Sequence, residues 1–144
     1  MNYIHIDPES GEHAIHSNDQ LASFLEKHLD QYGDRKEDIL ACMEYCMDPK
    51  RGGFIIAAID SGEPVGVVVV NNTGMKGYIP ENILVYIAVR GDQRGKGVGK
   101  GLMEQALERA RGSIALHVEP DNPARKLYES LGFTNKYLEM RLHR

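Results

Sequence analysis

The chain has 144 residues, of which 42% are hydrophobic and 26% charged, a balance typical of one folded domain with a substantial core. Its formal net charge of −4 disfavours non-specific binding to nucleic acid, because such binding depends on basic surface. No apolar run approaches the roughly 18 residues of a membrane span, and the N-terminal residues lack the pattern of a signal peptide. We therefore expect no membrane association and, by default, a cytoplasmic location.

The first half of the chain predicts a strand, two helices and a hairpin. Residues 2–6 form a short strand, and apolar residues then recur at helical spacing over 18–29 and 34–47. Residues 53–60 and 64–71 are rich in branched apolar side chains and are separated by a short turn that contains glycine. Such a short connection favours an antiparallel pair of strands.

Two cysteines fall on the second predicted helix. Cys42 and Cys46 are four residues apart, which places them on one face of that helix. A metal site requires more ligands, and none lies nearby in the sequence. We expect a buried, reduced pair and no metal.

The second half predicts strands that alternate with helices. The continuous apolar run of residues 83–89 is typical of a central strand covered on both faces. A helix over 98–110, a strand over 113–118 and a helix that begins at Asn122 follow, and alternating apolar residues predict a last strand over 136–142. The element order is β-α-α-β-β-β-α-β-α-β, which indicates an α/β fold with helices on a mixed sheet.

A glycine-rich segment, Arg94-Gly-Lys-Gly-Val-Gly-Lys-Gly101, lies between the run 83–89 and the following helix. Glycine lets the backbone approach a ligand closely and adopt positive φ. The free N–H groups at the start of the helix point toward that ligand, and the helix dipole adds positive potential. Arg94, Lys96 and Lys100 contribute formal charge, so the loop suits a phosphate or pyrophosphate.

Two common nucleotide loops do not fit this segment. A Walker loop needs four residues between its first glycines, but Gly91 and Gly95 have three between them, and Gly97 replaces the required hydroxyl residue. A Rossmann loop needs a third glycine at a position that here holds Lys100 or Leu102. A flexible turn with solvated charges remains the alternative, although glycines at two-residue intervals weaken a helix start without structural gain.

Two segments together resemble the GNAT superfamily of N-acetyltransferases. Residues 94–99 match its pattern of Arg or Gln, two residues, Gly, one residue, then Gly or Ala. Residues 122–133, Asn-Pro-Ala-Arg-Lys-Leu-Tyr-Glu-Ser-Leu-Gly-Phe, look like its later motif. The resemblance is detailed over 83–133 and implies one acetyltransferase domain over 1–144. The implied fold is a mixed, mostly antiparallel sheet with helices on both faces, splayed between its fourth strand and its fifth, over 113–118.

The resemblance implies acetyl-CoA as donor, bound in the splay. Backbone N–H groups of the glycine loop would bind the pyrophosphate, and the edge of the fourth strand would pair with the pantetheine arm and polarise the thioester. Asn122 would contact the cofactor from the other side, although it also suits a plain helix cap. The implied cofactor-binding residues are Ile87, Ala88, Val89, Arg94, Gly95, Lys96, Gly97, Val98, Gly99, Lys100 and Asn122.

Acetyl transfer also needs a proton acceptor and a proton donor. A lysine-type amine with a pKa of about 10.4 is neutral in roughly one molecule in a few thousand at pH 7, so its proton must be removed. Tyr128 matches the family position that often protonates the departing CoA thiolate, and otherwise it is a core aromatic. The family's glutamate on the fourth strand corresponds to Ile83, which cannot act. Glu81, two residues earlier, is the candidate base unless it is only a solvated charge.

The acceptor is a small-molecule or peptide amine that the sequence does not identify, and a homodimer is left open. The main alternative function is a non-catalytic acyl-CoA-binding or regulatory domain of the same fold, which Tyr128 disfavours. In the family, the first two helices and the loop before the fourth strand shape the acceptor site. If several of their acidic side chains line the cleft, a cationic amine is favoured. These stretches contain Asp30, Tyr32, Asp34, Glu37, Asp38, Tyr45, Tyr78 and Glu81.

Overall fold

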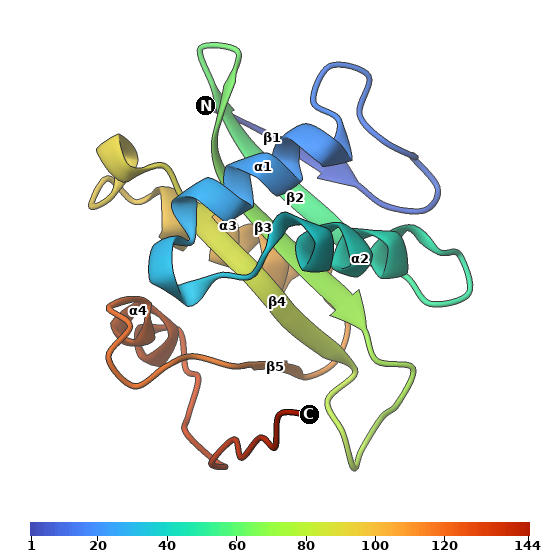
Figure 1. Ribbon diagram of the computed structural model, residues 1–144, viewed down its shortest axis with the longest axis vertical. Helices are drawn as coiled ribbons and strands as arrows, with labels where there is room; N and C mark the ends of the chain where they lie inside the picture. Colours follow the sequence, from blue (N-terminus) through green and yellow to red (C-terminus); the bar gives the residue numbers. More distant parts are fainter.

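The computed structural model describes residues 1–144, and its centre is a five-stranded sheet with the spatial order β1-β2-β3-β4-β5 (Figure 1). The first four strands are antiparallel to their neighbours, whereas β5 runs parallel to β4. This arrangement confirms the predicted mixed and mostly antiparallel sheet. The strands are β1 (Asn2–Ile6), β2 (Gly53–Asp60), β3 (Glu63–Asn72), β4 (Asn82–Val89) and β5 (Ile114–Leu116).

Four α-helices cover the sheet, two on each face. α1 (Asn18–His28) and α2 (Lys36–Met47) lie on one face, in front of the strands in Figure 1, and α3 (Val98–Arg109) and α4 (Ala124–Ser130) lie on the other. The connections include the short 3-10 turns η1 (Asp30–Tyr32) and η2 (Gly91–Gln93). None of the four helices has the length and apolar character that crossing a bilayer requires.

The core consists of two apolar clusters separated by the sheet. In β2, Ile55 and Ala57 join the cluster under α1 and α2, whereas Ile56 and Ala58 join the cluster under α3 and α4. Successive side chains of a strand point to opposite faces, so helices on both faces bury both sets. Each fully buried Leu or Ile side chain stabilises the fold by about 1.5–3 kcal/mol, which explains why this hairpin is apolar throughout.

The fourth strand differs from our expectation. The run 83–89 was predicted to be covered on both faces, but in β4 Val85 is 36% exposed and Ile83, Ile87 and Val89 are only half-buried. For Val85, Ile87 and Val89 the short β5 contributes to this exposure, because β5 was expected over 113–118 but has only three residues. It pairs with Asn82, Ile83 and Leu84 and leaves the rest of β4 without a neighbour on that side.

The predicted last strand is wrong. Residues 133–144 have no regular secondary structure, and the apolar side chains that suggested a strand are 75–90% exposed. A strand needs a neighbour for its backbone hydrogen bonds, and this segment pairs with none, so β5 forms the edge of the sheet. The exposed side chains are Tyr137, Leu138, Met140 and Leu142.

Candidate active site

The second half of β4 has a free edge, and this edge is the first component of the site. Pairing between β4 and β5 ends at Leu84 and Leu116. The pairing of β4 with β3 shifts at the same point, because Val69 faces Tyr86 whereas Val70 faces Leu84, which leaves Val85 as the extra residue of a bulge. A bulge bends a strand and increases its twist. Beyond it, β4 has no strand neighbour on the β5 side, so its backbone groups there, apart from the Val89 carbonyl that accepts from Arg94, can pair with an extended ligand.

The glycine loop continues from this edge into α3. Gly97 occupies the N-cap position of α3 with φ 85°, and Gly95 has φ 78°, so both adopt the left-handed conformation that glycine favours. A Cβ atom added at either residue would meet nothing within 4 Å, so the backbone is open toward a ligand. The N–H groups of residues 95–100 donate to no backbone acceptor, as expected at a helix start. The loop fits a pyrophosphate.

Arg94 links the glycine loop to the end of α1. Its Nε donates to the carbonyl of Val89 at 3.2 Å, and its Nη2 donates to the carbonyl of His28 at 2.8 Å. The same nitrogen pairs with a carboxylate oxygen of Asp30 at 3.1 Å. Burial, assisted by Lys27 and Arg94, lowers the pKa of His28 below its usual value, so this imidazole is neutral at pH 7.

Residues 28–34, here called the strap, cross β4 on the α1 and α2 side (Figure 1). Beyond the two contacts with Arg94, the Tyr32 hydroxyl donates to the carbonyl of Asp121 at 3.4 Å, in the connection between β5 and α4. The Tyr86 hydroxyl of β4 donates to a carboxylate oxygen of Asp34 at 2.6 Å. The strap therefore contacts both walls of the splay and the glycine loop between them.

Tyr128 lies on α4, on the opposite face of the sheet from the strap. Its side chain is 7% exposed and packs near Phe133, with ring centroids 6.0 Å apart. Its hydroxyl donates no hydrogen bond within the protein, and burial raises its pKa to about 12, so it keeps its proton at neutral pH. Leu127, the residue before Tyr128, lies 3.5 Å from a Cβ built on Gly99, and so does Val89 at the end of β4. This contact places α4 beside the glycine loop.

Asn122 caps α4. Its Oδ1 accepts a hydrogen bond from the N–H of Ala124 at 2.9 Å, as the sequence predicts for a cap, and the helix begins at Ala124. The Nδ2 group of Asn122 makes no hydrogen bond within the protein and is free to donate to a ligand. The cap and a contact with the cofactor are therefore compatible.

Glu81 lies at the other end of the β4–β5 pair. Its Oε2 accepts a hydrogen bond from the backbone N–H of Ser113 at 3.0 Å, beside Gly112. At about 3.3 Å per residue, the six residues from Glu81 to Ile87 span roughly 20 Å along β4. The structure therefore does not bring Glu81 together with the glycine loop and α4.

The hydrogen-bonded pair of Asp34 and Tyr86 was not predicted from the sequence. Tyr86 is 8% exposed, and burial, together with the hydrogen bond to Asp34, raises its pKa well above the usual value of a tyrosine. The two residues are 52 positions apart, so nothing in their spacing links them. The available signal was an aromatic hydroxyl within the aliphatic run 83–89, which requires a polar partner when buried.

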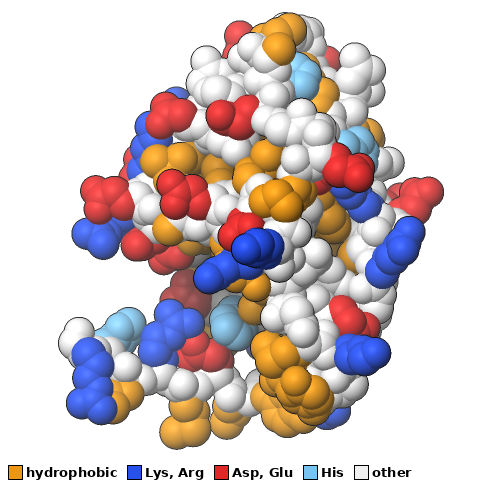
Figure 2. Space-filling model, turned by 90° about the vertical axis from the view of Figure 1, so that its right-hand side faces the viewer, with side chains coloured by type: hydrophobic (Ala, Val, Ile, Leu, Met, Phe, Trp, Pro, Cys, Tyr) orange, Lys and Arg blue, Asp and Glu red, His pale blue; other side chains and the backbone are white.

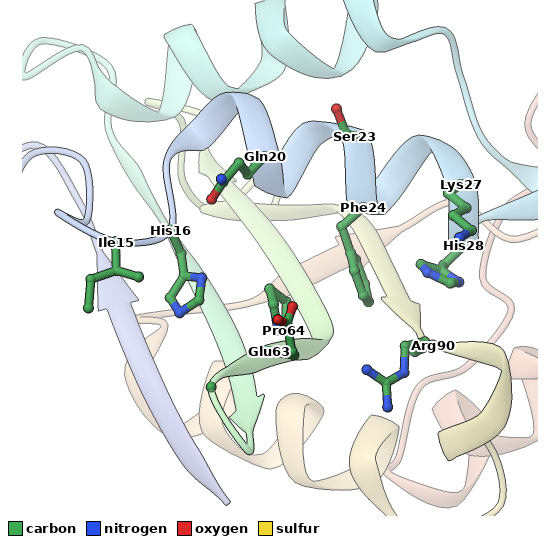
Figure 3. A pocket seen from close by; sticks show the side chains of 11 residues that line it. Ile15, His16, Gln20, Ser23, Phe24, Lys27, His28, Glu63, Pro64 and Arg90 are labelled. Carbon is green, nitrogen blue, oxygen red and sulfur yellow. The ribbon is translucent and has the colours of Figure 1, made fainter.

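One cavity lies outside the splay (Figure 3). It has a volume of about 510 Å³ and opens between α1 and the turn from β2 to β3, with Phe24, Lys27, Glu63 and Arg90 among its lining side chains. It contains no residue of the glycine loop, of β5 or of α4. The splay, by contrast, combines a free strand edge with an anion-binding loop against which α4 packs, so the splay is the candidate active site.

Comparison with known proteins agrees with this geometry. The family model described as the acetyltransferase (GNAT) family matches residues 14–133. A search of curated proteins finds no match. Solved structures are similar over nearly the whole chain, at identities that show the fold alone.

Three of these structures illustrate the range. A probable acetyltransferase is 22% identical with a TM-score of 0.72, covering 100% of this chain and 98% of its own. An aminoglycoside 6'-N-acetyltransferase from Acinetobacter haemolyticus is 19% identical with a TM-score of 0.65, covering 100% and 98%. A ribosomal-protein-alanine N-acetyltransferase from Brucella melitensis biovar Abortus 2308 is 18% identical with a TM-score of 0.63, covering both chains fully. The splayed sheet, the glycine loop and the match over 14–133 lead to one conclusion: the chain belongs to the GNAT acetyltransferase family.

Proposed function

We propose that the protein transfers the acetyl group of acetyl-CoA to a primary amine, by direct attack within a complex that holds both substrates. One observation carries the proposal: the free edge of β4 leads directly into a loop whose N–H groups at residues 95–100 are unpaired. An extended amide chain that ends in a pyrophosphate needs these two features in this order. Acetyl-CoA has such a chain and supplies the activated acetyl group as a thioester.

The chain's own groups would bind and orient this donor. The N–H groups from Gly95 to Lys100 would hold the pyrophosphate, with Lys96 adding charge. Ile87, Ala88 and Val89 would pair with the pantetheine arm as a strand does, and a backbone N–H there would polarise the thioester carbonyl. The side-chain NH2 group of Asn122, at the start of α4, would donate a hydrogen bond to acetyl-CoA from the other side of the splay. Arg94 and Val98 complete the loop, with Val98 buried beneath it and Gly99 packed against α4.

Tyr128 is the proposed acid that protonates the departing thiolate. The support is its hydroxyl, which makes no hydrogen bond within the protein and, with a pKa raised by burial, still carries its proton at neutral pH. Its location on a helix that packs beside the glycine loop is consistent with this role.

Glu81 remains a prediction for the group that takes the proton of the amine. Its carboxylate is engaged by the N–H of Ser113 and lies away from the glycine loop, so direct contact with an amine bound there is not supported by its position. The acceptor as a small-molecule or peptide amine, the cytoplasmic location and a homodimer are further predictions. Two of the similar structures are named as acetyltransferases of an aminoglycoside and of a ribosomal-protein alanine, and both names imply amine acceptors.

Incubation with acetyl-CoA and a panel of primary amines, followed by detection of released thiol, tests the proposal. Thiol release that depends on the amine, with acetylated amine identified by mass spectrometry, is the expected result. Tight CoA binding without transfer to any amine or peptide would favour the alternative, a non-catalytic acyl-CoA-binding or regulatory domain. Failure to bind CoA would reject both.

A further inference from the structure

Asp34 differs from the other acidic residues of the strap and of the start of α2. Asp30 pairs with the arginine that begins the glycine loop, and Glu37 and Asp38 lie 3.7 Å and 3.5 Å from Arg35. Asp34 forms no ion pair, and its side chain is exposed. It is therefore a carboxylate whose charge is not neutralised within the protein.

Tyr86 fixes the orientation of this carboxylate. The tyrosine is almost fully buried in β4, and its hydroxyl donates to Asp34 Oδ2 at 2.6 Å. Because its pKa is raised, Tyr86 stays a neutral donor over the whole working range of pH. A carboxylate offers about four acceptor positions, and Tyr86 occupies one of them. The remaining positions are available to a ligand that donates hydrogen bonds.

The pair lies beside the splay, on the side opposite Tyr128. Tyr86 lies two residues beyond Leu84, the last residue of β4 that pairs with β5. The hydrogen bond from Tyr32 to Asp121 connects the strap to the segment between β5 and α4. Figure 2 shows the surface deeply notched on the α1 and α2 side, with acidic side chains gathered above the notch. The strap, which carries Asp34, thus crosses β4 just beyond its last pair with β5.

We propose that Asp34 binds a positively charged group of the acceptor, and that the preferred acceptor is therefore an amine with a second cationic group. This inference rests on the proposed acetyl transfer to an amine. The reacting nitrogen must be neutral when it attacks, whereas a nearby carboxylate favours the charged form of whatever it binds. The nitrogen held by Asp34 and the nitrogen that reacts are for this reason different atoms. Tyr86 acts as a positioning residue that aims the carboxylate.

A pair of matched acceptors tests the inference. 1,4-Diaminobutane and n-butylamine share the same carbon chain and differ by one cationic group. We expect kcat/KM of the wild-type protein to favour the diamine by about tenfold or more, the factor typical of one hydrogen-bonded charge pair. In Asp34→Asn the preference should largely disappear, through a higher KM for the diamine at similar kcat. The variant should fold, because the asparagine carbonyl can still accept the Tyr86 hydroxyl.

Asp38→Asn is the matched control, because it removes the same charge from an exposed residue four positions away. It should keep the preference for the diamine. Tyr86→Phe, which leaves the carboxylate free to rotate, should lose part of the preference. Raising the ionic strength should reduce it in the wild type, because an exposed charge pair is screened by salt. Equal preference in the wild type and Asp34→Asn would overturn the inference.

A binding measurement separates this inference from the proposed transfer. With the protein saturated by CoA, 1,4-diaminobutane should raise the melting temperature of the wild type and of Asp38→Asn, but not of Asp34→Asn. This readout needs no turnover, so it holds even if no acetyl group is transferred. Stabilisation that is absent from the wild type, or equal in all three proteins, would reject the site.

Discussion

The two halves of β4 have similar sequences and opposite surroundings. In the first half, Asn82, Ile83 and Leu84 pair with β5, and polar side chains reinforce the pairing. Asn82 Nδ2 donates to the carbonyl of Arg111 at 2.6 Å, and Glu81 accepts from the N–H of Ser113. In the second half, the backbone faces a gap. The comparison shows that a strand can be kept open for a ligand when its other half is held firmly.

The paired half of β4 contributes mainly to stability, and the open half is the part that a substrate would use. Asn82 is only 3% exposed, and each hydrogen bond that it makes contributes about 0.5–1.5 kcal/mol to stability. The open half contributes little backbone pairing on that side, but its unpaired groups are those that a donor substrate would use. Substitutions at the closed end should therefore change the free energy of unfolding, and substitutions around the open end should change binding and turnover.

The largest effect is expected from Gly97→Glu. The new side chain must adopt φ 85° and adds negative charge where the pyrophosphate would bind. CoA at about a hundred times its Kd should add about 2.7 kcal/mol to the stability of the wild type, and nothing to that of the variant, as measured by thermal unfolding. Gly74→Glu is the control, because Gly74 has φ 77° and equally open surroundings in the loop between β3 and β4. Unchanged CoA affinity in Gly97→Glu would contradict the assignment of the loop.

Tyr128→Phe should have the next largest effect. It keeps the buried ring and removes the hydroxyl, so turnover should fall on the order of a hundredfold with little change in CoA affinity. Because burial raises the pKa of Tyr128 to about 12, the wild type should lose no acid catalysis between about pH 7 and 10. Steady-state kinetics over this range provides the measurement. A variant as active as the wild type would return Tyr128 to a purely structural role in the core.

Glu81→Gln tests whether Glu81 acts in catalysis or only supports the pairing of β4 with β5. Glutamine can still accept the N–H of Ser113, so the fold should be unaffected. If Glu81 takes the proton of the amine, the rate should fall about tenfold at low pH and recover as the pH approaches the pKa of the amine. The control is Glu108→Gln, at an exposed carboxylate on α3 without a bonded partner. A pH–rate profile parallel to that of the wild type would show that Glu81 serves only the closed end.

Asn82→Ala should change stability alone, and by the smallest amount. Removal of its amide leaves the carbonyl of Arg111 without that donor, so urea unfolding should show a loss of about 1–3 kcal/mol. CoA affinity and turnover of the folded protein should not change. Asn72→Ala, at the exposed residue that faces Asn82 on β3, should cost much less. A loss of CoA affinity in Asn82→Ala that exceeds its loss of stability would break the separation between the two halves.

Local patterns in the sequence were sufficient for most of the fold. Helical spacing located the helices to within a few residues, the glycine turn predicted the hairpin of β2 and β3, and two motifs indicated the family. These features depend on neighbours in the chain. The two cysteines form no disulfide, as expected, but only Cys46 is fully buried and Cys42 is half-buried; burial raises the pKa values of Cys42 and Cys46 to about 11 and about 12.

The errors concern neighbours in space. The alternating pattern of residues 136–142 suits a strand, but no pattern within a segment specifies which edge, if any, it pairs with. The exposure of Val85 has the same origin, because it depends on where β5 ends. The link between Asp34 and Tyr86 bridges 52 residues, and Glu81 proved to bond to a segment more than 30 residues away. Long-range pairings of this kind leave no periodic trace in a single sequence.

Arg94 has a consequence for how the two substrates would influence each other. Its guanidinium holds Asp30 and the His28 carbonyl on the strap, although it belongs to the loop proposed for the pyrophosphate. If the pyrophosphate binds to the loop in this way, it competes with Asp30 for the guanidinium of Arg94. The position of the strap, and of Asp34 on it, would then depend on whether acetyl-CoA is bound. The two binding equilibria are then thermodynamically linked. By whatever factor the donor changes the affinity for the acceptor, the acceptor must change the affinity for the donor by the same factor.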